Sequence, residues 1–188
     1  MNQKREVHKV SIAGIERDLP LFEVAPGIRI AIVNILGDTE LVQAASRDLA
    51  IKLADRNPEV LVTAETKSIP LVHALSVVMA LPYVVLRKDY KPYMGDALKA
   101  ETLSITTGKS QILYLDEKDK KFVQGRRIAL VDDVISTGST LQAMRLLMEK
   151  AGAEVVTEAA IFTEGDRARW TGVVALGHLP VFSEHDKK

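Results

Sequence analysis

Cysteine is absent from the 188 residues of this chain. The protein therefore cannot form a disulfide, attack a substrate through a thiol or bind zinc through cysteine, and it is suited to a reducing compartment. Net charge is absent as well, because 25 basic residues balance 25 acidic ones. Such a balance gives no overall field that would favour nucleic acid or an anionic membrane, so any anion site has to be local.

Long uninterrupted hydrophobic runs are also lacking. The longest apolar stretch, residues 69–86, contains His73, Ser76 and Pro82. This composition is typical of a core helix followed by a strand rather than of a membrane span, and His73 is expected to be a core residue. The polar residues 1–10 do not have the pattern of a secretory signal. We therefore expect a cytoplasmic protein without a membrane partner.

Apolar periodicity and turn signals divide the chain into alternating elements. The expected helices are 39–56, 69–80 and 139–151. The expected strands are 7–13, 28–33, 60–64, 83–88, 111–116, 126–133 and 154–162, followed by one or two more in the tail. Because strand and helix alternate from residue 39 to residue 162, we expect an α/β fold with a twisted, mainly parallel sheet and helices on both faces.

Two connections have weak periodicity. Residues 89–110 are expected to form a long hairpin or a mobile loop, because long connections of this kind are usually functional. Within them, TTGKS at 106–110 is similar to the end of a Walker A loop, but that motif requires glycine at position 103, which is leucine here. Residues 117–125 are expected to be a charged connection.

The stretch IALVDDVISTGST at 128–140 places two acids after an apolar run and before a loop of Ser, Thr and Gly that leads into a helix. A helix N-terminus with such a loop favours anions, and Gly138 permits close approach of a phosphate. Asp132 and Asp133 would repel that anion, so we expect them to face a diol, a metal ion or a cation. A sugar phosphate satisfies both requirements. In the simpler alternative, the acids only end the strand and a hydroxyl caps the helix.

Two basic segments follow other predicted strands, ETKS at 65–68 and RKDYK at 87–91. Ligands of open α/β sheets bind at the carboxyl ends of the strands, where these segments are expected to lie beside the acids. Together their cations would suit a polyphosphate. The four cations are Lys67, Arg87, Lys88 and Lys91.

The 128–140 stretch resembles the diphosphoribose-binding signature of the type I phosphoribosyltransferases, and the order of elements from about 38 to 162 is similar to that of their purine branch. The resemblance implies a single domain over residues 1–188. It also implies a small hood formed by about 1–37 and 163–188, and a flexible loop at about 89–110 that closes over the reacting centre.

The resemblance also implies a role for each matching position. The ribose hydroxyls of 5-phosphoribosyl 1-pyrophosphate (PRPP) would be bound by the catalytic pair Asp132 and Asp133. Its 5-phosphate would be bound by Ser136, Thr137, Gly138, Ser139 and Thr140. Its pyrophosphate would be bound by Thr66, Lys67, Ser68, Arg87, Lys88 and Lys91. The base would be contacted by the NIL segment, Asn34, Ile35 and Leu36, which is similar to a segment of the xanthine enzymes.

The implied reaction transfers the 5-phosphoribosyl group from PRPP to a purine base, with Mg2+ bound mainly through substrate oxygens, in a homodimer. The sequence departs from the adenine enzymes where Lys67 replaces Arg, Ser68 replaces Gly, and Thr106 replaces a Glu that assists catalysis. The base therefore stays open between adenine and a 6-oxopurine such as xanthine or hypoxanthine. The alternative is a PRPP-binding, purine-responsive regulatory protein without turnover. A phosphoacceptor receiver domain is disfavoured, because its paired acids follow the first strand.

Overall fold

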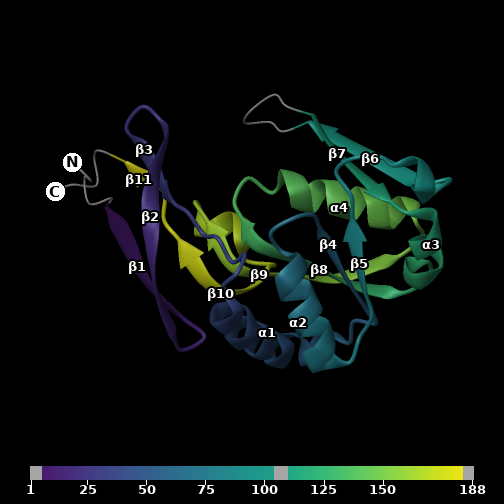
Figure 1. Cartoon of the computed structure of the whole chain (residues 1–188), viewed down its shortest axis with the longest axis horizontal. Coiled ribbons are helices and arrows are strands. Elements are labelled where there is room, and N and C mark those ends of the chain that lie inside the picture. The colour runs from purple at the N-terminus through teal and green to yellow at the C-terminus, as the bar shows by residue number, and fades with distance from the viewer. Residues whose placement is uncertain (1–5, 104–109, 184–188) are drawn as a thin grey trace.

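The main sheet of the protein has five strands in the order β10-β9-β8-β4-β5, and every neighbouring pair is parallel (Figure 1). The computed structural model describes residues 6–103 and 110–183. The strands of this sheet are β4 (Val60–Ala64), β5 (Tyr83–Leu86), β8 (Arg127–Ile135), β9 (Glu154–Glu164) and β10 (Val174–Leu179). The predicted α/β fold with a parallel sheet is therefore confirmed.

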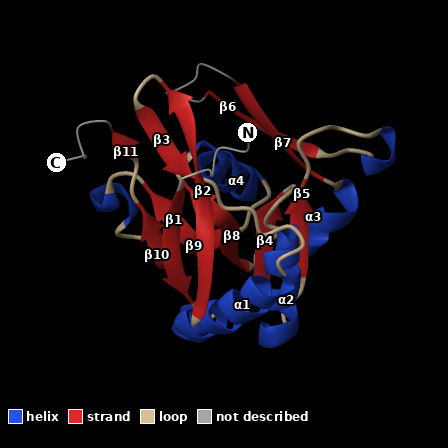
Figure 2. Ribbon diagram, turned by 60° about the vertical axis from the view of Figure 1, so that its left-hand side comes forward, coloured by secondary structure: helices blue, strands red, loops and turns tan. Residues whose placement is uncertain are grey.

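Helices cover both faces of this sheet. Helices α1 (Thr39–Leu53) and α2 (Ile69–Met79) pack side by side on one face, and α4 (Ser139–Lys150) packs on the other (Figures 1 and 2). Each face has its own apolar core. Among the described residues, no helix combines the length and apolar character needed to cross a membrane.

Helix α1 shows how local sequence sets these elements. The carboxylate of Asp38 accepts a hydrogen bond from the Leu41 N–H (3.1 Å), which satisfies one of the free donors at the helix start. Its buried side includes Leu41, Ala45, Leu49 and Leu53, the face that the periodicity predicted. The last predicted turn is instead a short 3-10 helix, η1 (Ala54–Arg56).

A second, smaller sheet joins the two ends of the chain. Its strands are β1 (Val7–Ile12), β2 (Ile15–Ala25), β3 (Ile28–Ala31) and β11 (Phe182–Ser183), in the antiparallel order β1-β2-β3-β11. Sequence patterns did not predict β2, because it exposes charged residues and includes Pro20. Strand β10 also comes from the segment expected to form the hood, but it belongs to the main sheet.

The region between β5 and β8 is more ordered than the sequence indicated. Strands β6 (Leu98–Leu103) and β7 (Ser110–Leu115) form an antiparallel hairpin against α4, which confirms the hairpin alternative for part of 89–110. The short 3-10 helix η2 (Pro92–Met94) precedes it. The prediction of an irregular connection at 117–125 is wrong for most of that segment. Asp116 caps a helix there, α3 (Glu117–Val123).

The prediction that His73 is a core residue is wrong. Its ring lies on the exposed side of α2 and meets the Tyr83 ring edge-on, with 5.8 Å between ring centroids. The buried side of α2 is instead formed by Leu71, Val72 and Leu75, and position 73 turns away from it.

Candidate functional site at the carboxyl ends of the sheet

Asp132 and Asp133 lie inside the last part of β8, which continues to Ile135 rather than ending at the acids. The Asp132 Oδ1 atom accepts two hydrogen bonds, from the Asp133 N–H (2.9 Å) and from the Ser68 hydroxyl (3.0 Å). Asp133 is 7% exposed, and its buried Oδ2 has no hydrogen-bond partner among the described residues. A buried acceptor without a partner is costly unless a ligand supplies the donor.

The two carboxyls influence each other electrostatically. Burial, followed by the negative charge of Asp133, raises the pKa of Asp132 to about 7, and the donated hydrogen bonds from the Asp133 N–H and from Ser68 oppose that rise. The site therefore changes its charge near neutral pH, which is uncommon for carboxyls and frequent in functional clefts.

The loop at 65–68 connects β4 to α2 and lies beside the acids. The peptide bond between Glu65 and Thr66 is cis. The Lys67 ammonium is 3.8 Å from the Asp133 Oδ2 atom, beyond hydrogen-bond distance, and donates to the Val33 carbonyl at 3.3 Å. Ser68 is buried and directs its hydroxyl to Asp132. This loop thus connects the acids with the segment that precedes Asn34.

Arg87 is already engaged inside the protein. Its Nε donates to the Glu65 carboxylate at 2.7 Å, and the backbone N–H of Lys88 donates to the same carboxylate at 3.3 Å. This contact with Glu65 raises the pKa of Arg87 further above its usual range. Arg87 therefore holds the 65–68 loop, whereas the Lys88 side chain makes no hydrogen bond or ion pair in the described part of the chain and lines the cavity described next. Lys91 is exposed at the start of η2.

A cavity of about 160 Å³ joins these segments at the carboxyl ends of β4, β5 and β8. It brings together the whole 65–68 segment with parts of the other two predicted segments, 87–91 and 132–140, as the strand order requires. Lys91, Arg87 and residues 136–139 do not line it. The lining residues are Ala64, Glu65, Thr66, Lys67, Ser68, Lys88, Asp132, Asp133, Val134 and Thr140.

The loop at 136–140 turns into the N-terminus of α4 beside this cavity. Gly138 has a φ of +81°, and a Cβ there would come within 2.9 Å of the Trp170 ring, so glycine is required on both grounds. The Arg169 guanidinium donates to the Thr137 carbonyl at 3.1 Å, and Gln111 donates to the Thr140 hydroxyl at 2.9 Å. No sequence pattern indicated these supporting contacts, although Trp170 is the one tryptophan of the chain.

The predicted base segment lies between β3 and α1, and its three side chains have different environments. The Asn34 side-chain oxygen accepts from the Leu36 N–H at 3.3 Å. Leu36 is 47% exposed, whereas Ile35 is fully buried in the core. The side chains of Asn34 and Leu36 are therefore accessible to a ligand, and Ile35 could contribute only through its backbone. Thr106 lies outside the described residues.

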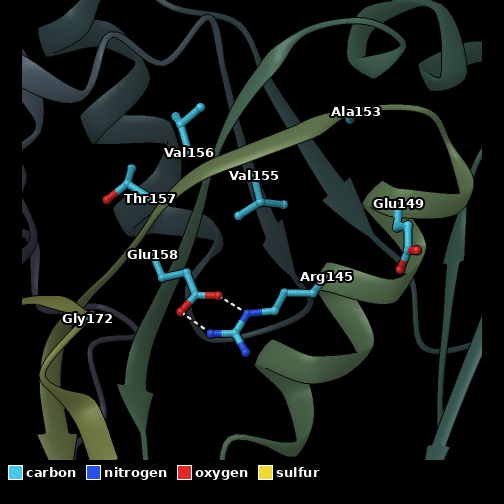
Figure 3. A pocket seen from close by; sticks show the side chains of 8 residues that line it. All are labelled: Arg145, Glu149, Ala153, Val155, Val156, Thr157, Glu158 and Gly172. Carbon is cyan, nitrogen blue, oxygen red and sulfur yellow. Dashed lines mark hydrogen bonds and ion pairs between the residues drawn. The ribbon is translucent and has the colours of Figure 1, made fainter.

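A larger groove, about 470 Å³, lies between α4 and β9, where Figure 3 shows Arg145 and Glu158 facing each other. The guanidinium donates two hydrogen bonds to the carboxylate, so these groups satisfy one another. Because the groove has no comparable unpaired acceptor, its size alone does not make it the better candidate. Among the described residues, no three His, Cys, Asp or Glu side chains gather into a metal site.

Residues 33–171 match the family model described as a phosphoribosyl transferase domain, and the chain belongs to that family. It is 38% identical over 123 residues to a hypoxanthine/guanine phosphoribosyltransferase of Methanococcus voltae, a match that covers 64% of this chain and 62% of that protein. The chain thus spans less than two thirds of this relative. The family resemblance read from the 128–140 stretch is confirmed.

Two further comparisons bear on the fold and on the alternative. The chain is 27% identical over 132 residues to a purine biosynthesis transcriptional repressor of Bacillus subtilis, covering 70% of this chain and 46% of that protein. The crystal structure of an adenine phosphoribosyltransferase from Thermoanaerobacter pseudethanolicus has a TM-score of 0.63 at 19% identity, covering 92% of this chain and 95% of that one. At this identity the structural likeness shows the fold alone.

Proposed function

We propose that the protein is a purine phosphoribosyltransferase of purine salvage, which transfers the 5-phosphoribosyl group of PRPP to a purine base and releases pyrophosphate. One observation carries the proposal. Asp132 and Asp133 line a cavity that Lys67 and Lys88 also line, and the buried Oδ2 of Asp133 has no hydrogen-bond partner among the described residues. Acceptors for hydroxyls and cations for phosphate therefore meet at one edge of the sheet, as a sugar polyphosphate requires.

The proposed placement of PRPP follows from these groups. Its 5-phosphate lies on the 136–140 loop, at the N-terminus of α4, where backbone N–H groups and the helix dipole favour an anion. Its ribose hydroxyls donate to Asp132 and Asp133. Its pyrophosphate lies near Lys67 and Lys88. Arg87, paired with Glu65, acts by holding the pyrophosphate loop.

The chemistry proposed for the site is charge placement rather than covalent catalysis. Displacement of pyrophosphate by a purine nitrogen develops positive charge on the ribose ring, as in other glycosyl transfers. The carboxylates of Asp132 and Asp133 lie where they favour that charge. A Mg2+ ion would supply charge neutralisation at the pyrophosphate. Since no cluster of three ligands exists among the described residues, it would take most of its ligands from substrate oxygens and water.

The base proposed is a 6-oxopurine. The relative with the higher identity is named for hypoxanthine and guanine, whereas the adenine enzyme shares the fold at 19% identity. We place the base between Asn34, Leu36 and the small sheet, which we propose to be the hood of a single domain. The homodimer also remains a proposal, and light scattering would test it.

An activity panel tests the proposal. Purified protein is incubated with PRPP, Mg2+ and adenine, hypoxanthine, guanine or xanthine, and the nucleotides formed are separated by chromatography. We expect a nucleotide and pyrophosphate from at least one 6-oxopurine. Formation of adenine nucleotide alone would contradict the choice of base, and no product from any base would contradict the enzyme.

The second candidate is a PRPP-binding regulatory protein without turnover. The comparisons do not favour it, because the match to the Bacillus subtilis repressor is 27% identical and covers 46% of the repressor, whereas the match to the Methanococcus voltae enzyme is 38% identical. The same panel separates the two, because a regulator binds PRPP and forms no nucleotide from any base.

A further inference from the structure

The hydroxyl of Ser68 connects the two halves of the site. Ser68 is 2% exposed, and its Oγ donates to the Asp132 Oδ1 atom at 3.0 Å across 64 positions of sequence. A second acceptor, the Ala64 carbonyl, lies farther away at 3.4 Å. The acid is therefore the better partner for the single hydroxyl hydrogen.

The position of Ser68 makes this contact informative. Serine at a helix N-cap usually accepts a hydrogen bond from the first turn of the helix. Ser68 is the N-cap residue of α2, yet its side chain makes no capping hydrogen bond. Its φ of −80° requires no glycine, so serine is accommodated without backbone strain where the adenine enzymes have glycine. The Ser68 hydroxyl therefore donates to Asp132 of β8 instead of capping its own helix, α2.

We propose that Ser68 is a positioning residue, whose hydroxyl holds the Asp132 carboxylate in the orientation that receives the ribose of PRPP. This inference rests on the proposed function. Two donors occupy Oδ1, namely Ser68 and the Asp133 N–H, and they fix the rotation of the carboxylate. In that orientation the carboxylate accepts a hydroxyl of the ribose.

The hydroxyl also supports the charge of Asp132. A donor to the ionised form favours that form, whereas burial and Asp133 act against it. The other charged groups that line the cavity are Glu65, Lys67 and Lys88. Because none of the three is itself within hydrogen-bond distance of Asp132 in the described contacts, Ser68 is the side chain that compensates the burial directly.

A pair of serine variants tests the role. In Ser68→Ala we expect kcat/KM for PRPP to fall about tenfold to a hundredfold, the range for losing a hydrogen bond to a charged group, with KM for the purine unchanged. The matched control is Ser76→Ala, a buried serine of the same helix whose hydroxyl bonds within α2, to the His73 carbonyl at 2.9 Å. The control should keep the PRPP kinetics of the wild type.

A second measurement needs no turnover and separates this inference from the proposed function. The carboxyl 13C shift of Asp132 is followed against pH by NMR in the wild type and both variants. We expect the titration midpoint of Asp132 to rise by about one pH unit in Ser68→Ala, and to stay in place in Ser76→Ala. This result would stand even if no purine were a substrate.

Three outcomes would overturn the role of Ser68. The first is wild-type PRPP kinetics in Ser68→Ala, the second an unmoved Asp132 midpoint despite lower activity, and the third an equal shift in Ser76→Ala. Should Ser68→Ala fail to fold, Ser68→Gly carries the same test, because glycine also lacks the hydroxyl and adds no atoms to the buried site.

Discussion

Two acids on adjacent strands of the main sheet have nearly the same burial and different surroundings. Asp133 of β8 is 7% exposed and Glu158 of β9 is 8% exposed. Glu158 is held by both arms of the Arg145 guanidinium, whereas the Asp133 Oδ2 atom has no hydrogen-bond partner among the described residues. Burial alone therefore does not identify a functional acid. A buried acceptor beside a cavity that has no hydrogen-bond partner among the described residues is the better indication of a candidate ligand site.

The largest expected effect comes from neutralising both Asp132 and Asp133. The double variant Asp132→Asn with Asp133→Asn should lower PRPP-dependent activity by about a thousandfold or more, because the ribose loses its acceptors and the developing charge its counter-ions. Circular dichroism should show an intact fold, since the change also removes repulsion between buried carboxyls. Full activity in a folded double variant would refute the ribose-binding role.

Changing pH should give the next largest effect. With the pKa of Asp132 raised to about 7, its charged form is lost as the pH falls below 7. We expect kcat/KM for PRPP to fall about tenfold per unit there. The contribution of Asp132 to folding stability changes with pH in the opposite direction to the activity. The folded state binds the proton of Asp132 more tightly than the unfolded state does, so this contribution is lost as the pH rises from about 4 to about 7. The rate profile of Glu158→Gln should match the wild type, and a flat profile below pH 7 would contradict the role of Asp132.

The smallest effect on activity is expected from the satisfied acid. Glu158→Gln breaks the contact with Arg145 and should lower the free energy of unfolding by about 2 kcal/mol, with Tm lower by about 4 to 8 °C. The matched control is Glu149→Gln, an exposed acid of the same groove, which should change Tm little. Activity of folded Glu158→Gln should stay within about twofold. A large loss of activity in Glu158→Gln without a loss of stability would contradict the distinction between a ligand-binding Asp133 and a structural Glu158.

The sequence predicted best those features that depend on one continuous segment of the chain. The two acids, Gly138 and the parallel sheet could be predicted, because Asp132, Asp133 and Gly138 lie in one continuous segment, formed by β8 and the loop that follows it. Contacts between distant segments were not readable. Nothing local indicated that Ser68 would bond Asp132, that Glu65 would hold Arg87, or that Trp170 would cover Gly138. These pairings depend on strand order, which periodicity does not specify.

Direct binding of PRPP is the measurement closest to the central claim. Isothermal titration calorimetry with PRPP and Mg2+, without any purine, is made on the wild type and on the double variant of Asp132 and Asp133. We predict saturable binding at one site per chain in the wild type and its loss in the folded double variant. No binding to the wild type, or equal affinity in both proteins, would contradict the assignment of this cavity to the ribose of PRPP.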